Sequence, residues 1–400
     1  MARISSRLAT VKPSASMAAS MAAKALRAKG IDVIDLGLGE PDFETPVHIV
    51  EGAYKAALAG ETRYAPPAGT PALRKAVAEK FTRENGLACT ADDVLVANGG
   101  KQIIFNALMA TIEPGDEVII PAPYFVSYPE MVTLLGGVPV IAECPRANGF
   151  RLTPEALEAA ITPRTKWLFL NSPNNPSGAV LDQGEQQALG AVLAKYPDVL
   201  ILSDEIYEHI LFDGRTFVSW GQACPELRDR SVIMNGVAKS YSMTGWRIGY
   251  ALAPADIVKA MSTVQSQSVS SVAAPTQAAA VFALTGPQDC VPQFREAFER
   301  RRNAVVTGIN AIPGLELDAP EGAFYAYIDC TGIIGKTTPE GRVLTSDTDV
   351  TEYLLNEGRV SAVAGSAYGL SPFFRISTAT ADDILTEAVR RIAEAVAKLG

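Results

Sequence analysis

The chain of 400 residues exceeds the size at which a single hydrophobic core keeps growing, so we expect two domains. Its composition, 48% hydrophobic and 20% charged, predicts a soluble globular protein, and no apolar run reaches the length of a membrane span. The formal net charge of −9 disfavours nucleic acid as the main partner but allows a small anionic ligand, because local charge can oppose the total.

The chain begins with a basic arm. Arg3, Arg7 and Lys12 precede the first acidic residue, Asp32. Transit peptides share this composition, but no apolar signal-peptide region follows. We therefore expect a short arm that leads into a helix at SMAASMAAKALRAKG, in a cytoplasmic protein.

Strand and helix patterns alternate through the middle of the chain. Short apolar runs such as DDVLVANGG and VLILSDE predict buried strands, whereas KQIIFNALMATI and DQGEQQALGAVLAKY have the apolar spacing of helices. Asp182 and Glu185 form a capping-box pattern at the start of the second of these helices. The alternation predicts a mostly parallel sheet covered by helices, in a large α/β domain over residues 46–288.

The pattern changes after about residue 290. A charged helix, PQFREAFERRRNAVVTGINAI, comes first, and the short apolar runs AFYAYIDC, RVSAVAG and FFRIST follow it. We expect a smaller α+β domain over residues 289–400, which the N-terminal residues 1–45 join.

Cysteines and histidines are few. The five cysteines are widely spaced and include no CxxC pair, which predicts buried free thiols in a reducing compartment. The two histidines, His48 and His209, have no partner at metal-ligand spacing, and the HExxH, Gly-x-Ser-x-Gly and P-loop patterns are absent. We expect no metal site, no histidine-based hydrolysis, and a surface or packing role for each histidine.

Polar and glycine clusters follow four of the predicted strands. In open α/β sheets, ligands bind outside the carboxyl ends of the strands. Taken singly, each cluster has a plain explanation: a turn, a β-turn, a helix cap or an exposed loop lysine. The clusters are Gly99-Gly100-Lys101, Asn171 to Asn175, Asp204 to Tyr207, and Gly236 to Lys239.

Taken together, the clusters match one ligand, pyridoxal 5′-phosphate. The glycine turn at a helix N-terminus offers N–H groups to a phosphate, and Arg247 can add a bidentate cation. Asp204 can keep a ring nitrogen protonated, and Tyr207 and Asn175 can hydrogen-bond to a ring oxygen. Lys239 offers an amine for a Schiff base. Because no acidic residue lies near Lys239 and Arg247 in the sequence, we expect the bound cofactor to balance them.

The sequence resembles the class I, fold-type I aminotransferases. It most resembles the bacterial aspartate aminotransferases of subgroup Ib, some of which also act on prephenate. The resemblance covers nearly the whole chain and implies a pyridoxal-phosphate-dependent transferase fold of type I. It rests on the motifs LGLGEPDFETP, RYAPPAGTPALRKAVAEKF, GGKQIIFNA, PGDEVIIPAPYFVSYPEM, NSPNNPSGAV, SDEIYEH, MTGWRIGYA, PEGAFYAY and FRIS, in this order.

This resemblance implies roles for the residues around the cofactor ring. Lys239 is the catalytic Schiff-base lysine and carries a proton between the substrate Cα and the cofactor. Asp204 pairs with the pyridine nitrogen, and Tyr207 and Asn175 hold the ring oxygen. Phe125 stands where close relatives usually carry a tryptophan. Its aromatic face preserves stacking on the ring, but the indole N–H contact to substrate is lost.

The phosphate is expected to contact three residues of its own chain and one of a neighbour. The resemblance assigns it to backbone groups of Gly100 and Lys101 and to the side chain of Arg247. Tyr64, in RYAPP, reaches the phosphate of the neighbouring subunit. The expected assembly is therefore a homodimer with shared active sites.

The resemblance also assigns the substrate-binding residues. Arg375, in FRIS, clamps the α-carboxylate with help from the backbone of Gly39, and Phe125 and Asn175 also face the substrate. Lys101 meets the distal carboxylate of aspartate or glutamate. The alternative interpretation, a solvated lysine on the first helical turn, is disfavoured. Lys12 could contact a prephenate carboxylate, but the favoured hypothesis is that its side chain is solvated.

The first hypothesis is ping-pong transamination from L-aspartate to 2-oxoglutarate, with conversion of prephenate to arogenate as a second activity. An aromatic or broad-specificity aminotransferase is the runner-up, and a pyridoxal-phosphate lyase is a third reading. A non-catalytic regulator usually carries an N-terminal DNA-binding domain, and here only about forty-five residues precede TPVHIV. A nicotinamide dehydrogenase is disfavoured because no G-x-G-x-x-G opens a βαβ unit.

Overall fold

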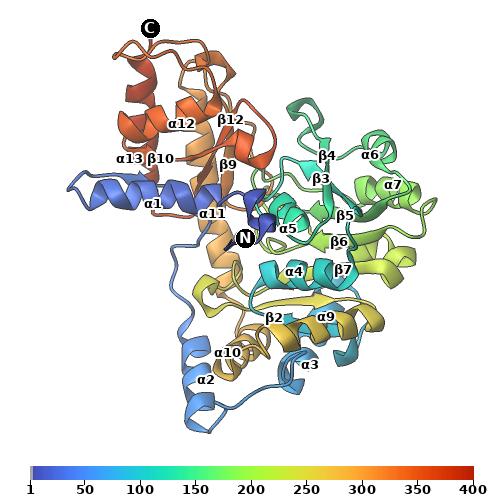
Figure 1. Ribbon diagram of the computed structural model, residues 1–400. Helices are drawn as coiled ribbons and strands as arrows, with labels where there is room; N and C mark the ends of the chain where they lie inside the picture. The colour runs from blue at the N-terminus through green and yellow to red at the C-terminus, as the bar shows by residue number, and fades with distance from the viewer. Residues whose placement is uncertain (1–2) are drawn as a thin grey trace.

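A seven-stranded mixed sheet forms the centre of the larger part of the molecule (Figure 1). The structure is a computed structural model and describes residues 3–400. The strand order is β2-β8-β7-β6-β5-β3-β4, and β8 alone runs opposite to the other six strands. The strands are β2 (Val94–Ala97), β3 (Glu117–Ala122), β4 (Val138–Glu143), β5 (Thr165–Asn171), β6 (Leu200–Asp204), β7 (Ser231–Gly236) and β8 (Gly249–Leu252).

Helices cover both faces of this sheet, which explains why its central strands are almost continuously apolar. Alternate residues of one strand enter different cores: Val118 and Ile120 pack on one face, and Ile119 on the other. The helices of this part are α2 (Val47–Leu58), α3 (Pro71–Asn85), α4 (Gly100–Thr111), α5 (Tyr128–Leu134), α6 (Pro154–Ala160), α7 (Gln183–Leu193), α8 (Trp220–Ala223), α9 (Ala255–Ser268) and α10 (Ala274–Thr285).

Local sequence signals place several helix ends correctly. Asp182 accepts a hydrogen bond from the Glu185 N–H, and the Glu185 side chain accepts from the Asp182 N–H, so the predicted capping box is present. The segment YFVSYPEMVTLLGG predicts a helix from residue 124, but α5 begins only at Tyr128. The strand β8 was not predicted, because it is only four residues long and three of them belong to the motif MTGWRIGYA, which contains two glycines.

The smaller part combines the C-terminal third of the chain with its N-terminal segment. A three-stranded antiparallel sheet has the order β11-β12-β9, and β1 pairs with β10 in parallel. The apolar run RVSAVAG splits into two short strands that join different sheets. The elements are α1 (Ala15–Arg27), β1 (Ile34–Asp35), α11 (Cys290–Asn310), β9 (Tyr325–Asp329), α12 (Asp347–Asn356), β10 (Val360–Ser361), β11 (Val363–Ala364), β12 (Phe373–Ser377) and α13 (Asp382–Ala397).

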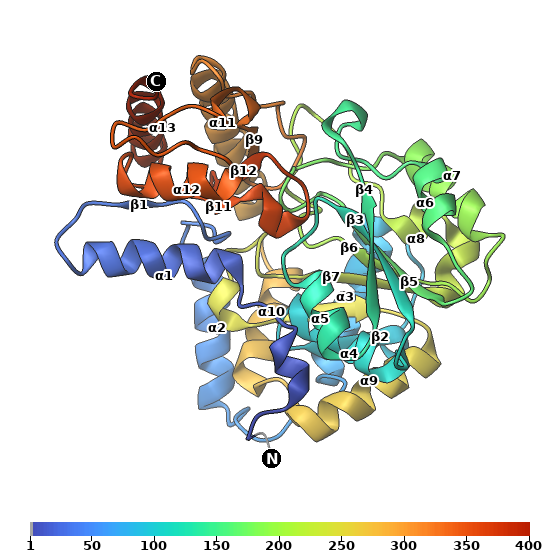
Figure 2. The same cartoon turned by 45° about the horizontal axis from the view of Figure 1, so that its top comes forward.

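Both ends of the chain contribute to this smaller part. The α1 helix lies beneath the C-terminal elements in Figures 1 and 2 and contacts β10 and β11. Ile34 and Leu36 share one apolar core with residues of α11 and α13. These contacts favour the domain boundaries at residues 46 and 288. The boundaries themselves stay a prediction. Short 3-10 helices connect the elements: Ser6–Ala9, Ala91–Asp93, Arg146–Asn148, Pro225–Arg230, Thr244–Trp246, Thr331–Ile333 and Gly365–Tyr368.

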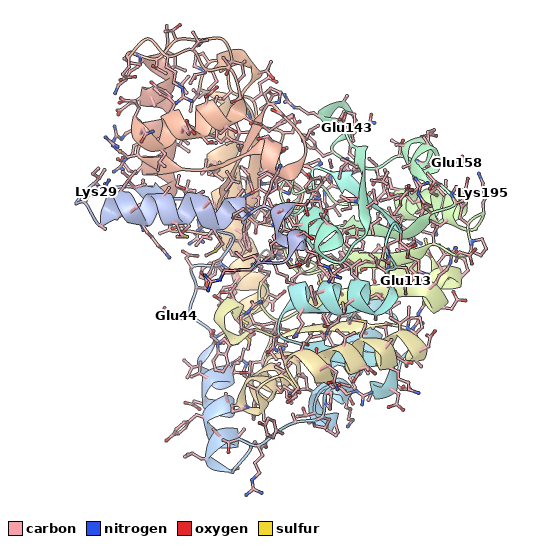
Figure 3. The ribbon with its side chains drawn as sticks, viewed as in Figure 1. Lys29, Glu44, Glu113, Glu143, Glu158 and Lys195 are labelled. Carbon is pink, nitrogen blue, oxygen red and sulfur yellow. The ribbon has the colours of Figure 1, made fainter. Side chains whose placement is uncertain are left out.

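Many charged side chains lie on the outside of the molecule (Figure 3), although some, such as Lys80 and Arg375, are buried. Figure 3 shows Lys29, Glu158 and Lys195 at its rim, and Lys195 pairs with Glu158 at 2.9 Å. All five cysteines are free thiols. Over residues 3–400, no helix is both long enough and apolar enough to cross a membrane.

Candidate active site

A cavity of about 370 Å³ lies at the carboxyl ends of β5, β6 and β7, where an open α/β sheet binds its ligands. Residues from the smaller part, on β9 and β12, close its other side. The structure therefore brings together nearly all of the predicted site residues in one place. Those that line the cavity are Gly39, Gly100, Lys101, Phe125, Asn175, Asp204, Tyr207, Lys239, Arg247 and Arg375.

One end of the cavity is shaped for an anion. The helix α4 begins at Gly100, and among the described residues no side chain caps its first turn. The guanidinium of Arg247 lies over this turn, and a Cβ added at Gly99 would come within 2.4 Å of it. Gly99 also has φ +84°, which favours glycine. Exposed helix N–H groups beside a guanidinium form a suitable phosphate site.

Asp204, the last residue of β6, presents a buried carboxylate. The Tyr128 hydroxyl donates to its Oδ2 at 2.6 Å, and the Ile206 N–H donates to its Oδ1 at 3.2 Å. Burial raises the pKa of Asp204 to about 6, although both hydrogen bonds and the charge of Lys239 oppose the rise. A protonated ring nitrogen nearby would favour the ionised form of this carboxyl.

Lys239 follows β7 and projects its amine into the cavity, where Nζ donates to the carbonyl oxygen of Gly39 at 2.6 Å. Burial lowers the pKa of Lys239 to about 8. The charge of Glu40 opposes this effect, and the charges of Arg247 and Arg375 add to it. A lowered pKa increases the fraction of neutral amine, the nucleophilic form.

No acidic residue lies near Lys239 in the sequence, but folding brings acidic side chains close enough to act on its charge. Glu40, almost two hundred residues earlier, accepts a hydrogen bond from Thr244 and acts on the charge of Lys239. The carboxylate of Asp204 also acts on the charge of Lys239. The cofactor is therefore not required as the only counterpart of this lysine.

Arg375, in β12, points a buried guanidinium at the cavity from the smaller part. Its Nη1 donates to the Asn175 side-chain oxygen at 3.0 Å, and its Nη2 donates to the carbonyl oxygen of Gly37. Its centre lies 4.5 Å from the ring centre of Tyr325. Its Nε is buried without a hydrogen-bond partner in the described part of the chain. A buried donor of this kind fits a carboxylate ligand.

Two tyrosines beside Asp204 and Tyr207 were not predicted. The Tyr325 and Tyr207 hydroxyls are 2.7 Å apart, and Tyr128 hydrogen-bonds to Asp204 as described above. Both lie in motifs that the sequence identified, PEGAFYAY and PYFVSYPEM. No sequence pattern could predict their partners, since each contact joins residues more than seventy positions apart.

Lys101 and Phe125 lie together in the wall of the cavity. The Lys101 Nζ is 5.3 Å from the ring centre of Phe125. Burial lowers the pKa of Lys101, and the nearby charge of Arg247 lowers it further. An anionic group in the cavity would oppose both effects.

Two residues that the sequence connected with the site lie outside the cavity of this chain. Tyr64 is 94% exposed. Lys12 is also exposed, and its backbone N–H donates to the Glu130 side chain at 2.7 Å. Within one chain, neither side chain contributes to the cavity that Lys239 lines.

The fold and the site define an aminotransferase. A sequence profile of the family described as Aminotransferase class I and II matches residues 31–392, and the chain belongs to this family. The aspartate aminotransferase of Rhizobium meliloti (strain 1021) is 51% identical, over 98% of this chain and 96% of that protein. The aspartate/prephenate aminotransferase of Cereibacter sphaeroides is 53% identical, over 98% of both chains.

Solved structures agree with this assignment. A crystal structure of an aspartate aminotransferase from Rhizobium meliloti superposes with a TM-score of 0.97, at 50% identity over 100% of both chains. The aspartate aminotransferase of Thermus thermophilus with maleate superposes with a TM-score of 0.92, at 43% identity, over 99% of this chain and 100% of that chain. The expected fold, a type I transferase with a mostly parallel sheet, is confirmed.

Proposed function

We propose that this aminotransferase transfers the amino group of L-aspartate to 2-oxoglutarate, and that it aminates prephenate to arogenate as a second activity. One observation carries the proposal: Lys239 and two separate cations, Arg375 and Lys101, line a single cavity. Aspartate, glutamate and their oxo acids each carry two carboxylates. The names of the relatives in Rhizobium meliloti and Cereibacter sphaeroides support aspartate and prephenate as substrates.

The residues present fit pyridoxal 5′-phosphate as the cofactor. The first turn of α4 and Arg247 would bind the phosphate, and Asp204 would bind the ring nitrogen. Tyr207 and Asn175 would bind the ring oxygen, and Phe125 would stack on the ring. When bound, this cofactor supplies an aldehyde that bonds to amino groups and a ring that withdraws electrons from the substrate Cα.

In the proposed reaction, Lys239 moves the proton. Its amine would hold the aldehyde of pyridoxal 5′-phosphate before substrate binds. The neutral Nζ would accept the proton from the substrate Cα, and the pKa of about 8 suits this role near neutral pH. The carboxylate of Asp204 keeps the ring nitrogen protonated throughout.

Arg375 and Lys101 orient the substrate. A bidentate contact between Arg375 and the α-carboxylate fixes the Cα next to Lys239. Lys101 meets the distal carboxylate and selects dicarboxylic substrates. Because both half-reactions use substrates with this pair of carboxylates, one site serves each half of a ping-pong cycle.

The proposed assembly is a homodimer in the cytoplasm. Tyr64 is 94% exposed, and the nearby helix α2 exposes Val47, Tyr54 and Leu58, each by more than half. Apolar side chains gathered on one helix favour burial against a second copy. The dimer would place Tyr64 at the neighbour's phosphate. The five free thiols are consistent with a reducing compartment.

An activity screen tests the proposal. The purified protein, loaded with pyridoxal 5′-phosphate, is given L-aspartate, L-phenylalanine or L-glutamate as amino donor, with 2-oxoglutarate, prephenate or phenylpyruvate as acceptor. We expect the largest kcat/KM for the pair L-aspartate and 2-oxoglutarate, and measurable amination of prephenate by L-aspartate or L-glutamate. A larger kcat/KM for phenylalanine than for aspartate would favour the runner-up, an aromatic or broad-specificity enzyme.

A further inference from the structure

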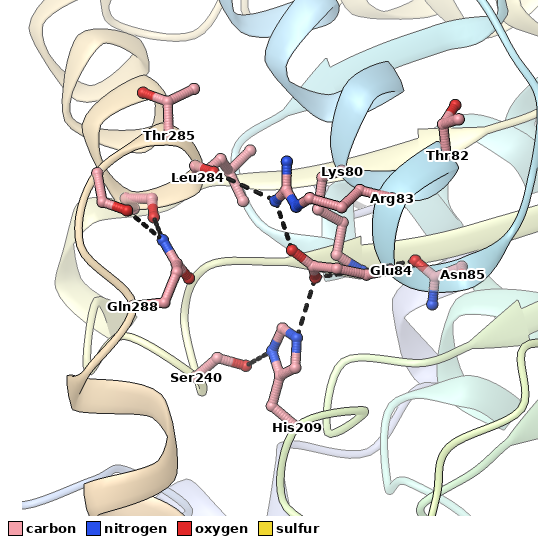
Figure 4. A network of polar contacts seen from close by, with 12 residues as sticks. Lys80, Thr82, Arg83, Glu84, Asn85, His209, Ser240, Leu284, Thr285 and Gln288 are labelled. Carbon is pink, nitrogen blue, oxygen red and sulfur yellow. Dashed lines mark hydrogen bonds and ion pairs between the residues drawn. The ribbon is translucent and has the colours of Figure 1, made fainter.

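A polar cluster lies behind the proposed cofactor site, at the C-terminal end of α3. We call it the α3 clamp, and it joins α3 to the two loops that follow β6 and β7. Figure 4 shows His209 between Glu84 and Ser240 in this cluster. The α3 clamp consists of Lys80, Glu84, Asn85, Glu208, His209 and Ser240.

One half of the clamp holds the loop after β6. The fully buried Lys80 ammonium donates to Glu208 and, at 2.8 Å, to the Asn85 side-chain oxygen. The Asn85 amide donates to the other Glu208 oxygen at 2.8 Å. Burial alone would raise the pKa of Glu208, but the charge of Lys80 and these hydrogen bonds hold it below its ordinary value. Glu208 directly follows Tyr207, so this half anchors the tyrosine's backbone.

The other half holds the loop after β7. The His209 Nε2 lies 3.1 Å from a Glu84 oxygen, and its Nδ1 lies 2.8 Å from the Ser240 hydroxyl. Burial raises the pKa of Glu84, but the hydrogen bond from His209 and the charge of Lys80 outweigh this and bring it to about 2.

An ionised carboxylate only accepts hydrogen bonds, so Nε2 carries the proton. In neutral His209, Nδ1 then accepts from Ser240, the residue after Lys239. The expected surface or packing role is therefore wrong for His209, which bridges two elements.

Two other readings of this cluster fail. Glu84, Glu208 and His209 place potential metal ligands within 4.8 Å of one another, but the Lys80 ammonium already binds Glu208 and lies 3.6 Å from Glu84. A metal ion would have to displace a buried, hydrogen-bonded cation. The Glu–His–Ser arrangement also resembles a hydrolase triad, but Ser240 is 3% exposed and no acyl substrate reaches it.

We propose that the α3 clamp positions Lys239 and Tyr207 relative to each other, and that Glu84, His209 and Ser240 act as positioning residues for Lys239. The inference rests on the proposed role of Lys239 in holding the cofactor. A side chain fixed at position 240 limits rotation of the preceding peptide, and so limits where the Lys239 amine can lie. The same helix fixes both loops, which keeps the amine and the tyrosine hydroxyl in one geometry.

The test compares Ser240→Ala, His209→Gln and the double variant, each loaded with pyridoxal 5′-phosphate. Its main readout is the midpoint pH of the absorbance change of the Lys239-bound cofactor. Each variant leaves the charged groups that act on Lys239 in place: Glu40, Asp204, Arg247 and Arg375. We expect both single variants to move the midpoint in the same direction, and the double variant to move it no further, because each breaks the same chain of hydrogen bonds.

Steady-state kinetics give a second readout. We expect kcat on aspartate to fall by about threefold to tenfold, the effect of one hydrogen bond, with little change in KM. KM should stay nearly unchanged because the proposed substrate-binding residues, Arg375 and Lys101, lie outside the clamp. The control is Thr82→Val, which removes an α3 hydroxyl that bonds to the backbone of Ala78 and Leu87, away from both loops.

Three results would overturn the clamp: unchanged midpoints in both single variants, shifts that add in the double variant, or an equal shift in Thr82→Val. If His209→Gln fails to fold, Ser240→Ala alone decides, since it deletes a single hydroxyl. The midpoint needs cofactor binding but no particular substrate. A protein that binds cofactor but ignores aspartate would therefore refute the proposed substrate while the clamp is still tested.

Discussion

The guanidinium of Arg375 donates a hydrogen bond to the side-chain oxygen of Asn175 at 3.0 Å, across 200 residues of sequence. Arg375 belongs to the three-stranded sheet of the smaller part, and Asn175 follows β5 of the seven-stranded sheet. The proposed substrate site is thus built where the two sheets meet. Chemistry at Lys239 therefore depends on the packing of one part against the other.

Cofactor attachment is the first prediction. Borohydride reduction of the loaded protein should fix pyridoxal 5′-phosphate to Lys239, because this amine lies in the cavity with a lowered pKa. Peptide mapping by mass spectrometry locates the label. The Lys239→Ala variant should still bind cofactor through Asp204 and Arg247 but barely transaminate. A label on another lysine would refute the assignment.

Arg375→Lys keeps the charge but loses the planar fork, so it should act as a disruptive change. We expect kcat/KM to fall by about tenfold or more for every amino acid and oxo acid, because all of them carry an α-carboxylate. The measurement is kcat/KM on aspartate, glutamate and phenylalanine. An effect limited to the dicarboxylic substrates would contradict the role of Arg375.

Lys101→Gln should change specificity instead. The variant removes the charge and keeps a donor, and the backbone at the start of α4 is unaltered. A charge-assisted hydrogen bond contributes roughly 1.5–3 kcal/mol, so kcat/KM on aspartate and glutamate should fall by about tenfold to hundredfold. Phenylalanine should change little, and prephenate, with its second carboxylate, should fall with aspartate. Equal losses on all substrates would indicate a role in cofactor binding or folding.

Hybrid dimers test the position of Tyr64. If Tyr64 reaches the neighbour's phosphate, a mixture of Tyr64→Phe and Lys239→Ala homodimers should form hybrids in which one site carries neither change. Activity should then rise above that of either parent after subunit exchange. Exchange is followed by native mass spectrometry. Exchange without recovered activity would show that Tyr64 does not act in the neighbouring site.

Tyr128→Phe should alter the pH dependence of the reaction. The Tyr128 hydrogen bond favours the ionised form of Asp204, whose pKa burial has raised to about 6. Without this donor the pKa of Asp204 rises further, so more of the carboxyl is protonated at a given pH. The acidic limb of the kcat/KM profile should therefore move to higher pH.

Tyr353→Phe is a matched control for this change. Its hydroxyl donates to the Ala395 carbonyl oxygen at 2.8 Å, within the core of the smaller part. Its pH profile should match that of the unmodified protein. An unchanged acidic limb in Tyr128→Phe would mean that this hydrogen bond does not control the ionisation of Asp204.

The sequence by itself determined the features that depend on neighbours along the chain. The turn at Gly99 and Gly100, the capping box at Asp182, and the position of Lys239 after a buried strand all follow from local patterns. Because parallel strands end at the same edge of a sheet, these patterns also located the cavity.

Tertiary structure alone decided which side chains meet. The partners Tyr128 and Asp204, Tyr207 and Tyr325, and His209 and Ser240 come from different elements, and their contacts depend on how helices pack on the sheet. The charge of Glu40 reaches Lys239 for the same reason. The antiparallel direction of β8 also depends on strand pairing between segments far apart in the chain. Local propensity carries no information on such pairings, since side chains distant in sequence meet only after the sheet and its helices have packed.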